Sequence, residues 1–427
     1  MPRRYFLQTL GCKLNQADTA RLAAELDARG MQPVSTPAQA DLMVVNTCTV
    51  TSRADADGRH ALRRLRRANP DARLIAMGCT ASRDPRSLSA LDGVDVVSPG
   101  CDPRPVIRAA MAAFPGDIDA GATPYHIVPT IPGRTRAYLK VQDGCDLACA
   151  YCIIPSVRGR SRSIPAAEIE ASLARLIGAG FVEVVLTGVN TGDWGRDLPG
   201  APRLLDLLQR LVSVPGLGRL RLNSLEPRTV DDPLIEWLAG EPRMAPHLQI
   251  PLQSGSDSIL ARMRRNYRRG FYRDLLARLE RALPGIGLGA DVIVGFPSES
   301  EADFSLTETL VEESPLAYLH VFSYSARPGT DAADLPDPVD PAVIRERATR
   351  LRKLAARKGT RFRRRHIGRT VEVITLEDAR PDGRIRSLTG NFFEVLLPAG
   401  SARANRLVPV RIVSADASGA RGIPVAA

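Results

Sequence analysis

The sequence has no long uninterrupted apolar run, and its first residues lead directly into a strand-like segment rather than into the apolar stretch of a secretory signal. A chain of this kind is expected to be neither secreted nor membrane-spanning. Cysteine is scarce as well, because seven residues among 427 exclude a disulfide scaffold. Together these absences predict a cytoplasmic protein.

The length and the charge narrow the possibilities further. A chain of 427 residues is longer than most single domains, so two or three domains are expected. The formal net charge is +11 and comes mainly from arginine, which is typical of proteins whose partner is rich in phosphate. A proteome rich in arginine and alanine would give the same bias, so the charge alone does not identify the partner.

Three of the cysteines stand close together in residues 144–152. Cys145, Cys149 and Cys152 are at positions i, i+4 and i+7, a spacing that lets one short loop turn three sulfurs toward a common centre. A closed zinc site needs four ligands, and no fourth is close in sequence. An iron-sulfur cubane held by three thiolates keeps one iron open for another ligand. A partial zinc site or three unrelated thiols is the alternative interpretation.

This spacing, with the aromatic Tyr151 just before the last cysteine, resembles the signature of the radical S-adenosylmethionine (SAM) enzymes. The resemblance implies a 4Fe-4S cluster on Cys145, Cys149 and Cys152. It also implies that the amino and carboxylate groups of SAM bind the open iron, and that Tyr151 lies against the adenine.

Residues 1–115 alternate short apolar runs with helical patterns, which predicts an α/β domain with a parallel sheet. Strands are expected at residues 5–10, 42–45, 74–77 and 94–97. Asp18 is expected to cap the first helix.

A second group of cysteines follows the strands of this predicted domain. Cys12, Cys48 and Cys79 each come just after one of the first three strands. Parallel strands bring these loops to one edge of the sheet, where open α/β sheets bind ligands, so the three thiols are expected to converge. Buried core cysteines are the alternative, and Cys101, which follows no strand end, is interpreted as structural.

Residues 116–134 are rich in glycine, proline and threonine, which predicts a linker. Beyond it, residues 135–340 resume the βα alternation with six strands, which predicts a partial (βα)6 barrel whose active site lies at the carboxyl ends of the strands. The loops there carry residues that could cradle SAM, because glycine permits close backbone approach and amide or carboxylate groups can bind its ammonium and hydroxyls. Ordinary turn chemistry is the alternative for each of these residues. They are Thr187, Gly188, Asn190, Ser224, Glu226, Gln253 and Gly295.

The last part of the chain changes character. Residues 341–365 predict a long connecting helix that ends in a basic run, and residues 366–427 contain short strand-like runs that fit a small β-barrel. The basic run alone would suggest a solvated face. Beside a small β-barrel, phosphate binding is the better interpretation.

Two cysteine trios followed by a small β-barrel resemble the methylthiotransferases across nearly the whole chain. Residues 11–16 (GCKLNQ), 46–50 (NTCTV) and 78–79 (GC) are similar to the N-terminal motifs of that family, and the last barrel is similar to its RNA-binding TRAM domain. Residues 13–16 and 153–163 are most similar to the branch that acts on N6-threonylcarbamoyladenosine at position 37 of tRNA. Residues 291–297 support the family without choosing a branch. Ser298 and Asn223 depart from it, since they stand where glycine and serine are common.

The resemblance implies a division of labour between the two trios. The cluster on Cys145, Cys149 and Cys152 would split SAM reductively, and the resulting 5′-deoxyadenosyl radical would remove hydrogen from C2 of the adenine. A second 4Fe-4S cluster on Cys12, Cys48 and Cys79 would hold sulfur, which a second SAM methylates before transfer. Two SAM molecules per turnover, an electron donor and a sulfur source are therefore implied.

Recognition of the tRNA anticodon loop would require the nucleotide at position 37 to be splayed into a cleft between domains. Lys13 is a candidate for meeting the threonyl carboxylate, and a surface lysine beside a cluster is the alternative. Candidates for holding phosphates are Arg262, Arg264, Arg265, Arg268, Arg269 and residues 361–365.

Three rival functions stay open at this point. Two are branches of the same family, one acting on an aspartate of a small-subunit ribosomal protein and one on isopentenyladenosine at position 37 of tRNA. The third is a non-catalytic iron-sulfur protein that binds RNA.

Overall fold

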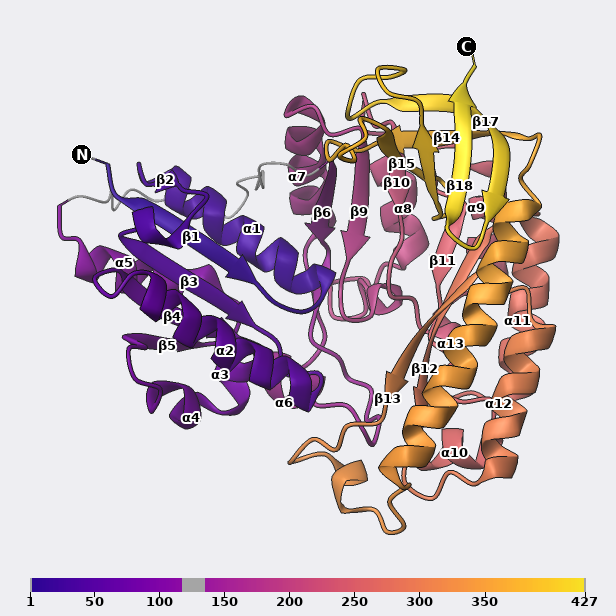
Figure 1. The fold of residues 1–427 in the computed structure, drawn as a ribbon, viewed down its shortest axis with the longest axis horizontal. Helices are drawn as coiled ribbons and strands as arrows, with labels where there is room; N and C mark the ends of the chain where they lie inside the picture. Colours follow the sequence, from indigo (N-terminus) through magenta and orange to yellow (C-terminus); the bar gives the residue numbers. More distant parts are fainter. Residues whose placement is uncertain (1, 117–134, 426–427) are drawn as a thin grey trace.

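The structure is a computed structural model that describes residues 2–116 and 135–425. Almost all of the predicted linker at residues 116–134 lies outside the described part. The described chain forms an N-terminal α/β domain, a central half-open barrel with a long helix at its side, and a closed C-terminal β-barrel (Figure 1). None of the helices in these two ranges is both long enough and apolar enough to cross a membrane.

The N-terminal domain is a parallel five-stranded sheet with helices on both faces (Figure 1). The strand order is β2-β1-β3-β4-β5. All six residues of β3 are buried, as expected for a strand covered on both faces. The strands are β1 (Arg4–Thr9), β2 (Gln32–Pro33), β3 (Leu42–Thr47), β4 (Arg73–Gly78) and β5 (Val96–Pro99), and the helices are α1 (Lys13–Asp27), α2 (Ser52–Ala68), α3 (Cys79–Arg83), α4 (Pro85–Ser89) and α5 (Pro103–Ala113).

The prediction that Asp18 caps the first helix is wrong. Helix α1 begins five residues earlier, with Cys12 at its N-cap position, because Gly11 at φ +95° turns the chain directly from the first loop into the helix. Asp18 therefore lies within the second turn of α1, where its side chain is buried.

The central barrel consists of two three-stranded parallel sheets, in the orders β10-β9-β6 and β11-β12-β13. A parallel bridge between Leu220 and Met244 joins the two sheets, so six strands form a half-open barrel. The strands are β6 (Arg136–Lys140), β9 (Glu183–Thr187), β10 (Arg219–Arg221), β11 (His247–Gln249), β12 (Gly287–Val294) and β13 (Tyr318–Ser323), and the outer helices are α7 (Ala166–Gly178), α8 (Leu204–Val212), α9 (Asp232–Gly240), α10 (Asp257–Arg262), α11 (Arg269–Ala282) and α12 (Glu301–Glu313). Two short strands, β7 (Gln142–Asp143) and β8 (Arg162–Ser163), and helix α6 (Ile154–Arg158) extend the loop after β6.

Helix α13 (Pro341–Arg364) runs along this barrel and leads into the C-terminal barrel (Figure 1). Ala348, Leu351 and Leu354 face the core of the central barrel, while most of the helix's basic residues lie on its other faces. The C-terminal barrel closes in the order β14-β15-β16-β18-β17. Its strands are β14 (Thr370–Thr375), β15 (Ile385–Thr389), β16 (Glu394–Leu397), β17 (Leu407–Asp416) and β18 (Gly419–Pro424).

The C-terminal barrel covers the end of the central barrel where strands β6 and β9 begin (Figure 1). Arg221 of the central barrel connects it to the C-terminal barrel. Its guanidinium donates to the carbonyls of Thr389 and Gly390 at 3.1 and 2.8 Å and also pairs with Glu183 at 3.0 Å. Burial would raise the pKa of Glu183, but Arg221 and Arg219 outweigh it and lower that pKa to about 2. The opposite end of the central barrel is left for the cysteine loop.

Candidate functional site

One loop carries the three cysteines of the central barrel. Cys145 is buried, while Cys149 and Cys152 are half-buried. The loop is tight: the N–H of Cys152 donates to the carbonyl of Cys149 at 3.0 Å, and that of Cys145 to the carbonyl of Gly159 at 3.1 Å. Gly144 has φ +71°, and a Cβ there would stand 2.0 Å from the carbonyl oxygen of Arg160. Only glycine therefore allows this loop to close.

Arg265 lies against this loop, which was not expected. It donates from Nη1 to Cys149 Sγ at 3.1 Å and forms an ion pair with Glu226, and its side chain is only 2% exposed. The prediction that Arg265 holds tRNA phosphates is therefore wrong for this residue. Burial raises the pKa of the Glu226 carboxyl, and Arg265 acts against that effect. A guanidinium beside a cysteine sulfur would stabilise the negative charge of a thiolate ligand.

The N-terminal cysteines come from three separate loops. Cys12 follows β1, Cys48 follows β3, and Cys79 follows β4, and these strands are neighbours in the sheet. The loops approach closely, because a Cβ on Gly11 would stand 2.7 Å from Cys48 Sγ. Burial raises the pKa of Cys48 to about 11, and the charges of Cys12 and Cys79 add to that effect. The sheet thus gathers these three thiols at one edge.

Cys101 lies beside this group, a contact that the sequence analysis missed. The N–H of Gly78 donates to the carbonyl of Gly100 at 2.8 Å, which lays the loop of Cys101 against the loop of Cys79. A hydrogen bond from Cys101 lowers the pKa of Cys79 to about 7, and Arg158 contributes against the effect of burial. Cys101 is therefore a neighbour of the N-terminal trio.

Arg158 joins the two parts of the chain that carry the trios. Its buried guanidinium donates to Asn15 Oδ1 at 2.6 Å, to Asp18 Oδ2 at 3.0 Å and to Asp143 Oδ1 at 3.0 Å. Lys140 completes the network, since its ammonium lies 2.7 Å from Asp18 Oδ1 and 2.6 Å from Asp143 Oδ2. Two carboxylates and two cations therefore fix the loop of Cys145 relative to helix α1.

A cavity of about 220 Å³ lies beside Cys152 and the loop that follows Cys48. The N-terminal domain contributes Val50 and Thr51, which follow Cys48, and the barrel loop contributes Tyr151 and Cys152. The remaining wall comes largely from strand ends and loops of the central barrel, including Gln253, Asp291, Ile293, Phe322, Ser323, Tyr324 and Ser325. The loop that follows Cys48 and the loop of Cys152 therefore border one cavity.

The residues predicted to cradle SAM lie at this end of the barrel. Thr187 Oγ1 and Asn190 Oδ1 are buried and have no hydrogen-bond partner within the described residues. Gln142 Oε1 accepts from the N–H groups of Val189 and Asn190 at 2.9 and 3.0 Å, so it holds the loop in place. Buried polar atoms without partners are uncommon, and here they fit a polar ligand such as SAM.

Of the other residues predicted to bind SAM, some line the cavity and others are explained by contacts within the protein. Tyr151 and Gln253 line the cavity, while Glu226 is engaged by Arg265. Gly188 leaves room for Gln142, because a Cβ would stand 2.8 Å from its Oε1. Ser224 has φ +59° and follows β10 closely. At Gly295 a Cβ would stand 2.3 Å from Ile344 of α13, so packing of the helix already accounts for that glycine.

The thiols suit a cluster better than a single ion. Within residues 2–116 and 135–425, no three cysteine, histidine or acidic residues are grouped closely enough to hold one metal ion. A cubane binds each thiolate through a different iron, so its ligands stand farther apart than those of one ion. Three thiols without a fourth protein ligand are compatible with an iron-sulfur cubane that keeps one iron open.

Lys13 leaves the N-terminal domain and reaches the central barrel. Its ammonium donates to Asn223 Oδ1 at 2.8 Å and lies 5.6 Å from the centre of the Phe392 ring. Burial lowers the pKa of Lys13 to about 8, and the charges of Arg136 and Arg221 add to that effect. The interpretation of Lys13 as a surface lysine is therefore wrong.

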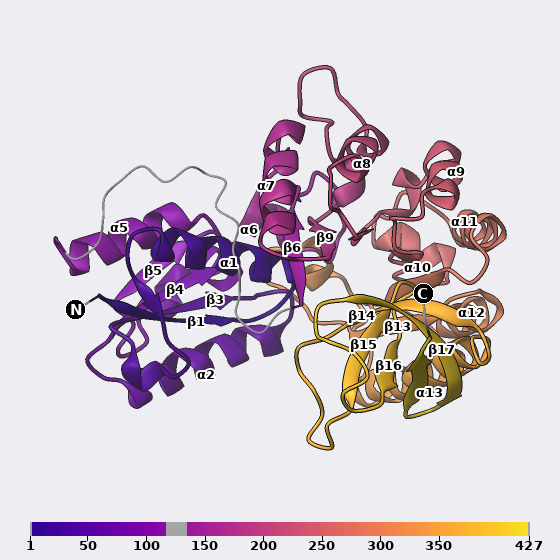
Figure 2. The same cartoon turned by 90° about the horizontal axis from the view of Figure 1, so that it is seen from above.

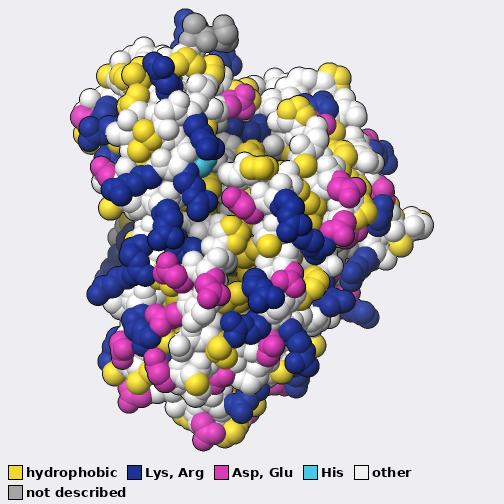
Figure 3. Space-filling view, turned by 90° about the vertical axis from the view of Figure 1, so that its right-hand side faces the viewer, with side chains coloured by type: hydrophobic (Ala, Val, Ile, Leu, Met, Phe, Trp, Pro, Cys, Tyr) yellow, Lys and Arg dark blue, Asp and Glu magenta, His cyan; other side chains and the backbone are white. Residues whose placement is uncertain are grey.

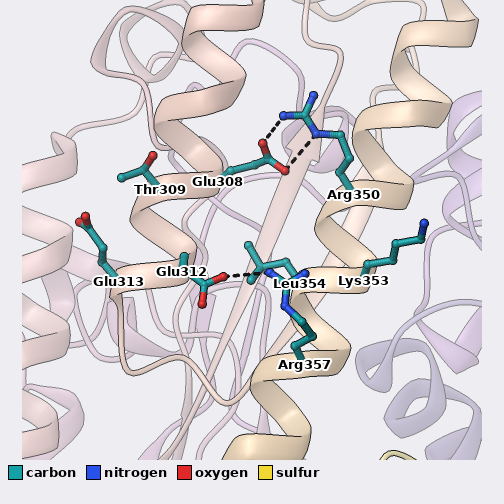
Figure 4. Close-up of a pocket in the computed structure, with 8 residues that line it drawn as sticks. All are labelled: Glu308, Thr309, Glu312, Glu313, Arg350, Lys353, Leu354 and Arg357. Atoms are coloured by element: carbon teal, nitrogen blue, oxygen red, sulfur yellow. Dashed lines mark hydrogen bonds and ion pairs between the residues drawn. The ribbon is translucent and has the colours of Figure 1, made fainter.

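A larger cavity of about 420 Å³ lies away from the cysteines, between α12 and α13. Figure 4 shows Arg350 and Arg357 reaching across it toward Glu308 and Glu312, while Lys353 points away. These opposite charges pair with one another across the gap. We therefore assign it no role in the chemistry.

Comparison with protein families divides the chain in the same way. The model described as "Radical SAM superfamily" matches residues 139–311, and the one described as "Uncharacterized protein family UPF0004" matches residues 4–98. The match at residues 4–98 includes Cys12, Cys48 and Cys79 and the strands that precede them. Membership of the radical SAM superfamily implies one 4Fe-4S cluster and SAM.

Several relatives are similar along most of their length. The tRNA-2-methylthio-N(6)-dimethylallyladenosine synthase of Chloroflexus aurantiacus is 38% identical over 99% of this chain and 91% of its own. The threonylcarbamoyladenosine tRNA methylthiotransferase MtaB of Bacillus subtilis is 35% identical over 95% of this chain and 93% of its own. The ribosomal protein uS12 methylthiotransferase RimO of Anaeromyxobacter is 38% identical over 88% of this chain and 82% of its own.

Among solved structures, the radical SAM methyltransferase TsrM from Kitasatospora setae, with tryptophan and a SAM analogue bound, has a TM-score of 0.59. It is 16% identical, and the match covers 78% of this chain and 75% of that chain, so the likeness concerns the fold alone. The curated relatives carry the stronger argument, because their identity exceeds 30% over nearly full-length chains. The protein is therefore an enzyme, and it belongs to the radical SAM methylthiotransferase family.

Proposed function

We propose that this enzyme inserts a methylthio group at C2 of N6-threonylcarbamoyladenosine at position 37 of tRNA, giving 2-methylthio-N6-threonylcarbamoyladenosine. The observation that supports this proposal most is the single cavity bordered by both cysteine loops, one from each domain. Methylthio transfer requires a radical to form on the substrate and sulfur to arrive at the same carbon. A shared cavity is what such a coupled reaction needs.

In this proposal, Cys145, Cys149 and Cys152 hold a 4Fe-4S cluster with SAM, and Cys12, Cys48 and Cys79 hold a second one. When bound, these groups supply a carbon radical that can remove hydrogen from an adenine C–H bond and a sulfur that can be methylated, at a cost of two SAM per turnover. An electron donor and a sulfur source are required partners. Because its proposed substrate is tRNA, we expect the enzyme to act in the cytoplasm.

The side chains of the protein position these groups and exclude water. Arg265 stabilises the charge on Cys149, and Thr187 and Asn190 offer polar atoms to SAM. Tyr151 lies in the cavity wall beside Cys152, where an aromatic face can stack on the adenine of SAM. Arg158 keeps the two cysteine loops in a fixed relation.

Binding of the anticodon stem and loop would use the basic surface around α13 and the C-terminal barrel. Lysine and arginine side chains are spread over the face that carries α11, α12 and α13, with acidic side chains between them (Figure 3). Figure 2 shows the C-terminal barrel beside the central barrel. Exposed candidates for phosphate contacts are Arg262, Arg264, Arg268, Arg361, Arg364 and Arg365.

Mass spectrometry of tRNA nucleosides from a deletion strain tests the substrate. We expect threonylcarbamoyladenosine without the methylthio group in the mutant, and the methylthio form again when the gene is restored. Loss of the methylthio group from isopentenyladenosine, or from an aspartate of the ribosomal protein, would assign the enzyme to the corresponding branch instead. The relatives of all three branches are similarly close, so this measurement decides among them.

The hypothesis of a non-catalytic RNA-binding protein disagrees with membership of a family of enzymes. Reductive cleavage of SAM by the reconstituted protein would establish the activity for this chain directly. We expect 5′-deoxyadenosine to form in the presence of a strong reductant.

A further inference from the structure

Three parts of the chain meet around the side chain of Lys13. Lys13 begins helix α1 directly after Cys12, Asn223 follows β10 of the central barrel, and Phe392 lies in the loop between β15 and β16 of the C-terminal barrel. The ammonium donates to Asn223 Oδ1 at 2.8 Å and stands over the Phe392 ring at 5.6 Å. We call these three residues the Lys13 site.

The cation at this site has no carboxylate partner. Within the described residues, no acidic side chain forms an ion pair with Lys13, and the amide oxygen of Asn223 is the only hydrogen-bond acceptor found for its three N–H groups. The nearby Asp291 carboxylate instead accepts from Gln249 at 2.9 and 2.8 Å and pairs with His320 at 3.0 Å. A half-buried ammonium without an anion is unfavourable, since burial removes much of its hydration.

The surroundings add positive charge. Arg221 is fully buried and stands 5.3 Å from the same Phe392 ring. Arg221 shares the carboxylate of Glu183 with Arg219 and, at 3.7 Å, with Arg136, while Glu372 also pairs with Arg219 at 3.3 Å. The Lys13 site therefore carries positive charge that no carboxylate neutralises directly within the described residues.

Phe392 provides a flat apolar wall in a constrained conformation. It has φ +71°, which is costly for a bulky side chain and persists only where the surroundings fix it. Here the rings of His247 and Tyr318 fix it, with centroid distances of 4.5 and 5.5 Å. Such a wall suits a planar group that ends in an anion.

We infer that the Lys13 site selects the substrate by binding a carboxylate carried on the N6 substituent of the modified adenosine. This inference rests on the proposed function and adds the chemistry that separates its substrate from isopentenyladenosine. An apolar isopentenyl group would leave the ammonium unpaired, whereas the carboxylate of a threonylcarbamoyl group would neutralise it. Asn223, which departs from the serine common in the family, supports the ammonium in this role.

The test compares anticodon stem-loops that carry threonylcarbamoyladenosine, its neutral carboxamide analogue, and isopentenyladenosine. With the wild-type enzyme we expect the acid to be preferred over the carboxamide by about 10- to 100-fold in kcat/KM and in Kd, the loss expected for one charged hydrogen bond. Lys13→Met should abolish this preference by weakening the acid substrate alone. Lys353→Met is the matched control, because Lys353 is exposed on α13 and its loss should affect the three stem-loops alike and leave the preference for the acid unchanged.

Because Lys13 adjoins Cys12, a second variant separates recognition from damage to the cluster. Asn223→Asp places a carboxylate beside the ammonium and should reduce the same preference without altering the residue next to Cys12. Iron content measures damage to the cluster directly in both variants, and the acid-to-carboxamide ratio in kcat/KM is not changed by an equal loss of activity on both substrates.

The outcomes also distinguish this inference from the proposed function. If Lys13→Met and Asn223→Asp still prefer the acid over the carboxamide, the inference is wrong while threonylcarbamoyladenosine stays the substrate. If the wild-type enzyme modifies only isopentenyladenosine, or only an aspartate-containing peptide of the ribosomal protein, the proposed function itself is wrong.

Discussion

The two cysteine trios are assembled in different ways. Cys145, Cys149 and Cys152 belong to one loop of eight residues, which local turns and Gly144 hold in shape. Cys12, Cys48 and Cys79 are separated by more than thirty residues from one to the next and meet only because β1, β3 and β4 are neighbours in one sheet. The first trio therefore depends on local backbone geometry, and the second depends on the fold of a whole domain.

This difference predicts how each trio responds to change. A site within one loop should tolerate disturbance elsewhere in the barrel but fail when its own loop is altered. A site gathered from three loops should be sensitive to the packing between them, and its position relative to the other trio depends on the contacts of Arg158.

The largest effects are expected from the cysteines themselves. Cys149→Ala should abolish both SAM cleavage and methylthio transfer, whereas Cys12→Ala should spare SAM cleavage and abolish only the transfer. Chromatography of 5′-deoxyadenosine and mass spectrometry of the nucleoside product measure the two activities. Equal loss of SAM cleavage in both variants would contradict the proposed division of labour.

The next largest effect is expected at Arg158, which pairs with Asp18 of helix α1 and with Asp143 of the barrel loop. Arg158→Met leaves Asp18 and Asp143 buried with less compensation, and breaking a buried pair in this way costs roughly 3–5 kcal/mol in the free energy of unfolding. Urea unfolding measures that cost. Arg160→Met is the matched control two residues away, because the Arg160 side chain is 90% exposed and its pairing with Asp146 should contribute little.

The same ion pairs predict a dependence on pH. Burial would raise the pKa of Asp143, but Lys140 and Arg158 outweigh it and lower that pKa below its ordinary value of 3.8. The charged carboxylate therefore stabilises the fold fully at neutral pH, and this contribution is lost as the pH falls below about 4. Thermal unfolding across this range should show a smaller acid dependence for Asp143→Asn than for the wild type.

A pair of glycines probes the packing of the N-terminal trio. Gly11 and Gly100 both have positive φ, at +95° and +89°, so alanine should cost about 1–2 kcal/mol of backbone strain at either position. Only at Gly11 would the new Cβ collide with Cys48, whereas it would meet nothing within 4 Å at Gly100. Gly11→Ala should therefore reduce the iron bound by the N-terminal trio, as iron analysis in a Cys149→Ala background would show, while Gly100→Ala should not.

The smallest effect is expected at Cys101. Its thiol is hydrogen-bonded to Cys79, but the proposal already assigns three thiols to the N-terminal cluster, so Cys101→Ser should keep the iron content and the transfer activity close to those of the wild type. A clear fall in iron content would instead make Cys101 a ligand, and the N-terminal site would then have four thiols.

Much of the architecture could be predicted from the sequence because its signals are local. The spacing of Cys145, Cys149 and Cys152 lies within one loop, and the βα alternation shows in short apolar runs. Each N-terminal cysteine follows a predicted strand. Predicting that the three converge needed one further step, because loops after parallel strands lie at the same edge of the sheet. The basic residues were harder to interpret, since nothing local distinguishes Arg265, buried beside Cys149, from Arg268, which is exposed.

By itself, the sequence determined the number of thiols, their spacing, the order of the domains and the resemblance to one family, because each of these is carried by residues near one another in the chain. Only the tertiary structure decided which charges meet. Asp18 pairs with Arg158, which is 140 residues away in the sequence, and Lys13 donates to Asn223, which is 210 residues away. Neither contact can be recognised from the residues next to it in the sequence. Ion pairs and hydrogen bonds depend on distances of a few ångströms, which only the packing of the domains sets.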